Sequence, residues 1–231
     1  MPQDIPCFYV LANTRALPQA EAAARAEEIG TNLRVAAVRI GIDPRALGVV
    51  SRGDSTLRGH YPAETDALAR GLGWASPAVL LAPFFLEGKR YTAHDMHYVG
   101  AADGSGMLTP AGETEFARDR AFGYRASHLP SWVEEKTDGR VKASEVCSLT
   151  LDMIRSGGPN AVQAALAALP HAGADAVVVA NALTPSDMAV VTLGCVLPSL
   201  AHLHAPRAPY APPPSSPHPY PCSTLLQVHA S

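Results

Sequence analysis

The sequence lacks the short motifs by which many nucleotide-binding and hydrolytic enzymes are recognised. It contains no Gly-x-x-x-x-Gly-Lys-Ser/Thr phosphate loop, no Gly-x-Gly-x-x-Gly after a predicted strand, and no Gly-x-Ser-x-Gly nucleophile turn. A nucleotide site or a serine-hydrolase centre of recognisable pattern is therefore excluded.

Paired cysteines, long apolar runs and a large net charge are absent as well. The four cysteines show no Cys-x-x-Cys spacing, which argues against zinc and against a disulfide framework and favours a reduced compartment. No apolar run approaches the ~20 residues that cross a bilayer, and the first residues lack the pattern of a secretory signal. The net charge of −3 gives no general attraction to nucleic acid or to anionic membranes. We therefore expect a soluble, cytoplasmic protein with no metal, nucleic-acid or membrane partner.

Strand and helix patterns alternate along most of the chain. Short apolar runs are typical of buried strands, and apolar residues three or four apart are typical of helices. In order, the pattern predicts a strand at 7–12, a helix at 18–40, a strand at 47–50, a helix at 62–72, a strand at 78–83, a strand at 146–151, a helix at 159–169, a strand at 174–180 and a helix from 185. The polar, less regular residues 84–140 are expected to form functional loops. The predicted fold class is α/β, an open, mostly parallel, three-layer Rossmann-like sheet with helices on both faces, incomplete at both ends.

The composition changes abruptly near residue 197. Nine of the prolines crowd into 197–231, with Arg207 as the single charged residue among them. Such a segment cannot form a full hydrogen-bond ladder, so we predict a domain at 1–196 and a disordered or polyproline II-like tail at 197–231. A proline-rich ligand for aromatic-lined domains is one interpretation of this tail, and a terminus altered by a reading-frame or gene-model error explains the abrupt change better.

The most informative segment lies where the predicted strand at 47–50 gives way to the helix at 62–72. In open α/β folds, ligands bind at such strand ends. Glycines allow close backbone approach, and arginine forks match carboxylate or phosphate. The candidate site residues in this segment are Arg52, Asp54, Ser55, Thr56, Arg58 and Gly59, with Asp54 able to orient a hydroxyl or to act as a base. Arg15 joins them because its segment follows the strand predicted at 7–12, and Asn181 and Asp187 are expected at the same sheet edge.

The same residues could instead have purely structural roles. Asp54 or Ser55 could cap the following helix, and Arg58 could make a surface ion pair. His94, Asp95 and His97 suggest a metal site, but no clear third ligand accompanies the histidines. The charged run at 113–125 is typical of a solvated helix face, although Arg118 and Arg125 within it are candidates for anion contact.

Six stretches of the sequence resemble the N-terminal domain of the four-carbon acid sugar kinase family. Their order and spacing agree over 14–188, and the Asp-Ser-Thr-x-Arg-Gly stretch is the most specific. The stretches are Asp54–Gly59, Pro83–Phe85, Gly88–Thr92, His97–Val99, Thr114–Asp119 and Val179–Ala182.

The resemblance implies the substrate-binding part of an ATP-dependent kinase that phosphorylates a four-carbon sugar acid of threonate, erythronate or 3-oxo-tetronate type. It implies one domain for the acid and a separate C-terminal domain for ATP with Mg²⁺. By the same resemblance, Arg58 holds the carboxylate or the migrating phosphoryl group, Asp54 and Ser55 align hydroxyls, and Lys89 and Arg90 lie at a cleft between domains. A small-molecule sugar acid is then the expected partner, with self-association into a homo-oligomer as an option.

The sequence also departs from that family. Members usually begin with a strand and an Asp-Asp-x-Thr-Gly turn, and they end with a glycine-rich ATP domain; neither is found in this sequence. We therefore expect a fragment that cannot transfer phosphate alone. The alternative is a non-catalytic sugar-acid-binding module or an inactive remnant.

Overall fold

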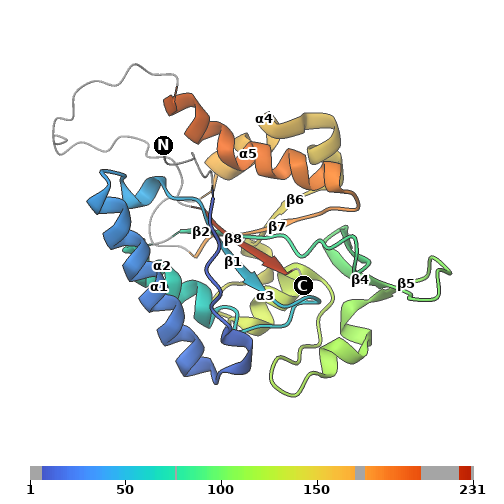
Figure 1. Ribbon diagram of the computed structural model, residues 1–231. Helices are drawn as coiled ribbons and strands as arrows, with labels where there is room; N and C mark the ends of the chain where they lie inside the picture. The colour runs from blue at the N-terminus through green and yellow to red at the C-terminus, as the bar shows by residue number, and fades with distance from the viewer. Residues whose placement is uncertain (1–6, 76, 170–174, 204–223, 230–231) are drawn as a thin grey trace.

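A five-stranded parallel sheet forms the centre of the molecule. The computed structural model describes residues 7–75, 77–169, 175–203 and 224–229. The strand order is β1 (Val49–Gly53), β8 (Thr224–His229), β2 (Ala78–Leu81), β7 (Val177–Ala180) and β6 (Cys147–Leu149). Every neighbouring pair in this sheet is parallel. The order of the sheet places β1 at one side of it (Figure 1).

Helices cover both faces of this sheet. They are α1 (Gln19–Arg39), α2 (Ala63–Leu72) and α3 (Leu129–Lys136) on one side, and α4 (Gly158–Ala167) and α5 (Pro185–Leu203) on the other (Figure 1). Side chains of a strand point alternately to its two faces. Accordingly Leu81 packs in the cluster that contains the α3 tryptophan, Trp132, whereas Leu80 packs with Val162 of α4 and Val191 of α5. The predicted three-layer α/β fold is confirmed.

Helices α1 and α2 cross at two glycines. A Cβ atom on Gly71 would lie 2.2 Å from the carbonyl oxygen of Glu27, and one on Gly30 would lie 2.6 Å from that of Leu68. Since no side chain fits there, the two backbones approach more closely than larger residues would allow. This crossing fixes α2, whose first turn follows the candidate site segment.

The polar middle of the chain contains a second, antiparallel sheet that the sequence did not predict. It consists of β3 (Arg90–Ala93), β4 (Met96–Gly100) and β5 (Leu108–Pro110). His94 and Asp95 form the two-residue turn between β3 and β4, both with positive φ. Short strands rich in polar residues give little periodic signal, which explains the missed prediction.

Single-turn helices connect these elements. They are η1 (Thr14–Ala16), η2 (Pro44–Ala46), η3 (Ala111–Glu113), η4 (Glu115–Arg118) and η5 (Ala143–Glu145), with one π-helical turn, η6 (Met153–Gly157).

The strand predicted at 7–12 is wrong. These residues form no strand, and the side chains of Phe8, Tyr9 and Leu11 are 71%, 93% and 93% exposed. An apolar run indicates that a segment can be buried, but a strand also requires a neighbouring strand with which it forms backbone hydrogen bonds. Strand β1 forms these bonds with β8 and not with residues 7–12. The strand predicted at 47–50 is shifted, since β1 runs from Val49 to Gly53.

The structure describes two parts of the predicted tail at 197–231. Helix α5 continues to Leu203, and Thr224–His229 forms β8 between β1 and β2. The intervening residues 204–223, which contain eight of the nine prolines of the predicted tail, lie outside the described residues, as does Cys222. A search of the described helices for one that is long and apolar enough to span a membrane finds none.

Candidate functional site

The segment after β1 forms a tight turn at the carboxyl end of the sheet. The amide of Asp54 donates to the carbonyl of Arg58 over 3.1 Å. Thr56 and Leu57 between them take left-handed conformations, with φ of 59° and 61°, and both are buried. Such backbone is costly for non-glycine residues and persists only when the surroundings hold it. Gly59, with φ of 145°, lets the turn return close to Gly53.

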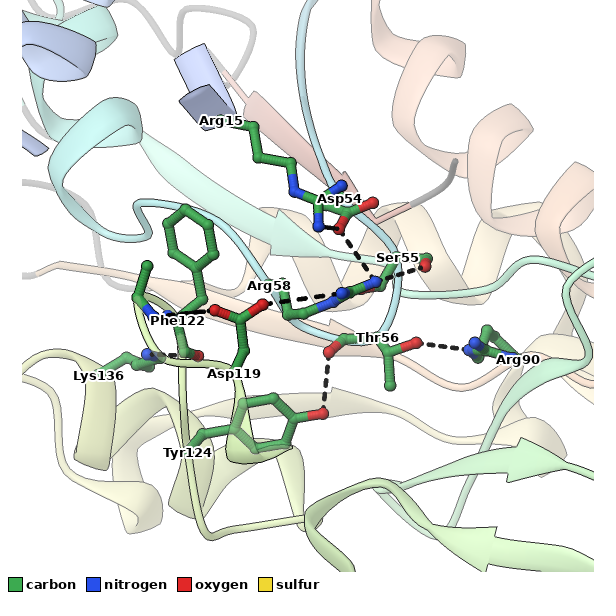
Figure 2. Close-up of polar contacts among 11 residues, drawn as sticks. Arg15, Asp54, Ser55, Thr56, Arg58, Arg90, Asp119, Phe122, Tyr124 and Lys136 are labelled. Carbon is green, nitrogen blue, oxygen red and sulfur yellow. Dashed lines mark hydrogen bonds and ion pairs between the residues drawn. The ribbon is translucent and has the colours of Figure 1, made fainter. Parts of the chain in front are cut away.

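Two residues from the middle of the chain hold this turn in place (Figure 2). The Tyr124 hydroxyl donates to the carbonyl oxygen of Thr56 over 2.8 Å, and Nε of Arg90 donates to Oγ1 of Thr56 over 2.5 Å. Burial raises the pKa of Tyr124, so the hydroxyl keeps the proton that it donates. The strained turn is therefore fixed from outside by side chains far away in sequence.

Arg58 lies within the turn and contacts several of its polar groups. Its Nη2 is 3.0 Å from Oδ2 of Asp54, and its Nε donates to the carbonyl of Ser55 over 3.1 Å. Its Nη1 is 3.7 Å from Oδ2 of Asp119, which is long for a hydrogen bond. The side chain is 15% exposed, so the guanidinium is partly desolvated and one of its nitrogens is only loosely engaged.

Asp54 is shared between two arginines. Nη2 of Arg15, from η1, also lies 3.0 Å from Oδ2 of Asp54 (Figure 2). The sequence prediction that the Arg15 segment meets the turn is therefore confirmed. The Arg15 side chain is 57% exposed against 13% for Asp54, so this pair is at the mouth of the site and contributes little to stability.

Asp119 completes the cluster from the end of η4. Its Oδ1 accepts hydrogen bonds from the amides of Ala121 and Phe122, at 2.9 and 3.1 Å. Although burial opposes ionisation, these amides and the nearby guanidiniums of Arg58 and Arg15 hold the pKa of Asp119 below its ordinary value. The carboxylate is therefore ionised at neutral pH.

The other predicted residues occupy different places. Arg52 is exposed on β1, ahead of the turn. Lys89 turns toward the loop after β4, where its Nζ donates to the carbonyl oxygens of Ala101 and Ala102. Ser55 is buried, with its Oγ 3.5 Å from Nη2 of Arg58.

Asn181 and Asp187 do not contact this cluster in the way that the sequence suggested. Asn181 donates to Oδ1 of Asp95 over 2.7 Å, and Asp187 receives two hydrogen bonds from Arg155. The reason is the strand order, because β8 and β2 lie between β1 and β7, whose end carries Asn181. These residues instead anchor the β3–β4 turn and the start of α5.

Reasoning from sequence missed three residues of the site. Tyr124 and Asp119 lie in the charged stretch that was interpreted as a solvated face, and Phe116 lies beside them. The Phe116 ring contacts two guanidiniums, Arg58 and Arg90, with their central carbons 4.9 and 4.7 Å from its centroid. The one signal for Phe116 and Asp119 was their place in the stretch Thr114–Asp119, which resembles the kinase family.

The assembled groups suit an anionic ligand that carries hydroxyls. Guanidiniums bind carboxylate and phosphate oxygens, while carboxylates and hydroxyls bind sugar hydroxyls. Next to the turn, Arg90 and Phe116 line a hollow of about 550 Å³ that also contains Glu113 and Glu115. Among the described residues, no group of three histidine, cysteine or carboxylate side chains could hold a metal ion.

Comparisons with known proteins identify the family of the domain. A family model described as a sugar-binding N-terminal domain matches residues 2–204. The search of curated proteins found no match.

Solved structures share the fold. A domain of unknown function (DUF1537) from Bordetella bronchiseptica, described as a domain-swapped dimer with bound citrate, is 21% identical with a TM-score of 0.58. Protein HI1011 of Haemophilus influenzae, assigned to the same DUF1537 family, is 15% identical with a TM-score of 0.59. The matches cover 93% and 94% of this chain but only 40% and 42% of those structures. This chain therefore spans about two fifths of the length of these relatives.

Proposed function

The chain belongs to the family of sugar-binding N-terminal domains, and we propose on that basis that it binds the substrate of a kinase that phosphorylates a four-carbon sugar acid. The acid is of threonate, erythronate or 3-oxo-tetronate type. Its carboxylate binds at Arg58, and its hydroxyls lie toward Asp54 and Ser55.

The observation that carries this proposal is the way in which Arg58 is held. The guanidinium is partly buried, fixed at Nε by Ser55 and at Nη2 by Asp54, and its Nη1 makes only the 3.7 Å contact with Asp119. A fork that is fixed at one side and loosely engaged at the other can receive a carboxylate with little loss of side-chain entropy. A surface ion pair would not need a strained turn to hold it.

The family resemblance alone suggests the other reactants, which are ATP and Mg²⁺. The family resemblance assigns ATP with Mg²⁺ to a separate domain, and the described residues offer no metal cluster that would fit Mg²⁺. We therefore assign no step of phosphoryl transfer to this chain. Within the proposed kinase, it orients the acid, and Asp54 accepts a hydrogen bond from the hydroxyl that it aligns.

Binding of citrate and domain-swapped assembly are described for the Bordetella relatives. We propose by analogy that this chain takes a small organic acid and that it self-associates. The oligomeric state is measured by light scattering on the purified chain.

A ligand panel tests the proposed function. Calorimetric titration of the chain with threonate and erythronate is expected to give binding, whereas the neutral four-carbon polyol erythritol is expected to give none. Equal binding of the polyol would contradict a carboxylate site. Adding ATP and Mg²⁺ to the same samples separates the two classes of function, since turnover indicates a kinase and binding without turnover indicates a sugar-acid-binding module.

A further inference from the structure

The segment that carries Arg15 has little packing of its own. It forms the single turn η1, none of whose residues is buried, and no side chain caps the start of that turn. The apolar residues 8–11 that precede it are exposed. The ion pair of Arg15 with Asp54 lies partly in solvent, so it holds the segment weakly. A further contact is therefore needed to fix the place of Arg15.

His60 makes such a contact. Its Nε2 lies 2.9 Å from the carbonyl oxygen of Leu17, two residues after Arg15, and the contact is partly buried. Because a carbonyl oxygen can only accept a hydrogen bond, Nε2 of His60 carries the proton and donates it. His60 directly follows Gly59 in the sequence. This hydrogen bond therefore joins the end of the Arg15 segment to the end of the turn that contains Asp54.

The His60 ring is itself held by Phe122. The two rings meet edge to face, with centroids 4.8 Å apart and planes at 78°, which is a favoured arrangement of aromatic rings. Phe122 is buried, and its backbone is fixed on both sides, since its amide donates to Asp119 and its carbonyl accepts from Lys136 of α3 (Figure 2). His60 therefore connects a firmly held loop with the loosely packed segment of Arg15.

We propose that His60 is a positioning residue, which holds the Arg15 segment so that the Arg15 guanidinium contacts the bound acid. Within the described part of the chain, Asp54 is the one ion-pair partner of Arg15, and it engages Nη2. The Nε and Nη1 donors of Arg15 are then left for an oxygen of the ligand. An acid that is held at Arg58 is thereby also bound from the segment before α1. This inference deepens the proposed function, and rests on it for the identity of the acid.

The first test measures backbone motion by nuclear magnetic resonance without any ligand. In the parent protein, ¹⁵N relaxation is expected to show the amides of Thr14–Leu17 to be as ordered as those of α1. His60→Phe keeps a ring beside Phe122 but has no donor for the Leu17 carbonyl, so these amides are expected to lose order. His60→Gln, whose side-chain amide can donate to the same carbonyl, is expected to retain it. Unchanged relaxation in His60→Phe would overturn the positioning role.

The second test is a double-mutant cycle, measured by calorimetric titration with erythronate. Arg15→Met and His60→Phe are each expected to weaken binding about fivefold, the size of one net hydrogen bond. If His60 acts through Arg15, then His60→Phe has no further effect in the Arg15→Met background. A merely structural role of His60 predicts instead that the two effects multiply, to about 25-fold. Multiplied effects in the double variant would therefore contradict the inference.

The outcomes separate this inference from the proposed function. If His60→Phe releases the segment but neither threonate nor erythronate binds the parent, the proposed function fails, and the positioning of the segment stands without the contact to the acid. If the acids bind the parent and Arg15→Met equally well, the inference fails alone. Should His60→Phe melt at a much lower temperature, the ¹⁵N spectrum of the imidazole in the parent protein provides the test. The proton is expected on Nε2, and a neutral ring protonated on Nδ1 would overturn the contact with Leu17.

Discussion

Asp54 and Arg58 close the site segment twice, once through the backbone and once through their side chains. The Asp54 amide donates to the Arg58 carbonyl over 3.1 Å, and Oδ2 of Asp54 lies 3.0 Å from Nη2 of Arg58. Both contacts need the left-handed backbone of the residues between them. The backbone conformation of the turn therefore also determines where the Arg58 guanidinium lies.

The hydroxyl of Tyr124 is expected to stabilise this turn. In Tyr124→Phe the buried carbonyl of Thr56 loses the donor that lies 2.8 Å away, which costs about 1–2 kcal/mol of unfolding free energy. The ring still packs, so no cavity adds to the loss. Urea denaturation measures the effect, and Tyr98→Phe is the matched control because no hydrogen bond joins the Tyr98 hydroxyl to a described residue. Equal losses in the two variants would contradict the role of Tyr124.

The crossing of α1 and α2 should not tolerate a methyl group at Gly71. Alanine favours helix by about 1 kcal/mol relative to glycine. Here the added Cβ would lie 2.2 Å from the Glu27 carbonyl oxygen, so the backbones must separate, and overpacking costs about 1–3 kcal/mol or more. We expect the clash to dominate, with a lower melting temperature for Gly71→Ala.

Gly48→Ala provides the comparison for that variant. Gly48 has no atom near its hypothetical Cβ and an ordinary φ, so the same substitution is expected to change the unfolding free energy by less than about 0.5 kcal/mol. A Gly71→Ala protein that melts with or above the Gly48→Ala protein would show that the helices do not cross this closely.

The pairing of Asp187 with Arg155 predicts a pH-dependent part of the stability. Hydrogen bonds from Arg155, opposed by burial and aided by the amides of Leu183 and Thr184, hold the pKa of Asp187 below its ordinary value. A lowered pKa in the folded state gives stability that is present above the unfolded value near 3.9 and is lost as the pH falls below it. The free energy of unfolding should therefore fall by about 1–3 kcal/mol between roughly pH 5 and pH 2.

Denaturation curves across this pH range test that assignment. Asp187→Asn removes the carboxylate and Arg155→Met removes its partner, so either variant is expected to flatten the same part of the pH profile. A profile of Asp187→Asn that runs parallel to the parent's would show that this carboxylate does not carry the effect.

The layered fold could be predicted from the sequence because the apolar patterns of helices and strands involve only residues that are close together in the chain. Helix α1 was predicted from apolar residues three or four apart, such as Ala22 and Ala26, and both of these are buried. The turn at 54–59 was predicted as a site since polar groups and glycine gather where a strand meets a helix. Both inferences use only neighbours in the chain.

The remaining features depend on partners far away in sequence. The apolar run that contains Phe8 and Tyr9 looked like a buried strand, but burial needs a neighbouring strand that no local pattern reveals. Phe116 looked like part of a charged surface, and its contacts come from Arg58 and Arg90, 58 and 26 residues before it. The spacing of residues along the chain cannot predict such long-range contacts.

The most direct test of the central claim is a calorimetric titration of the parent and of Arg58→Lys with erythronate or threonate. Lysine keeps the charge but not the planar fork, so the affinity is expected to fall about tenfold or more. Arg70 of α2 forms an exposed ion pair with Glu27 of α1, so the control variant Arg70→Lys is expected to leave the affinity for the acid unchanged. Equal affinities of the parent and Arg58→Lys would contradict the account.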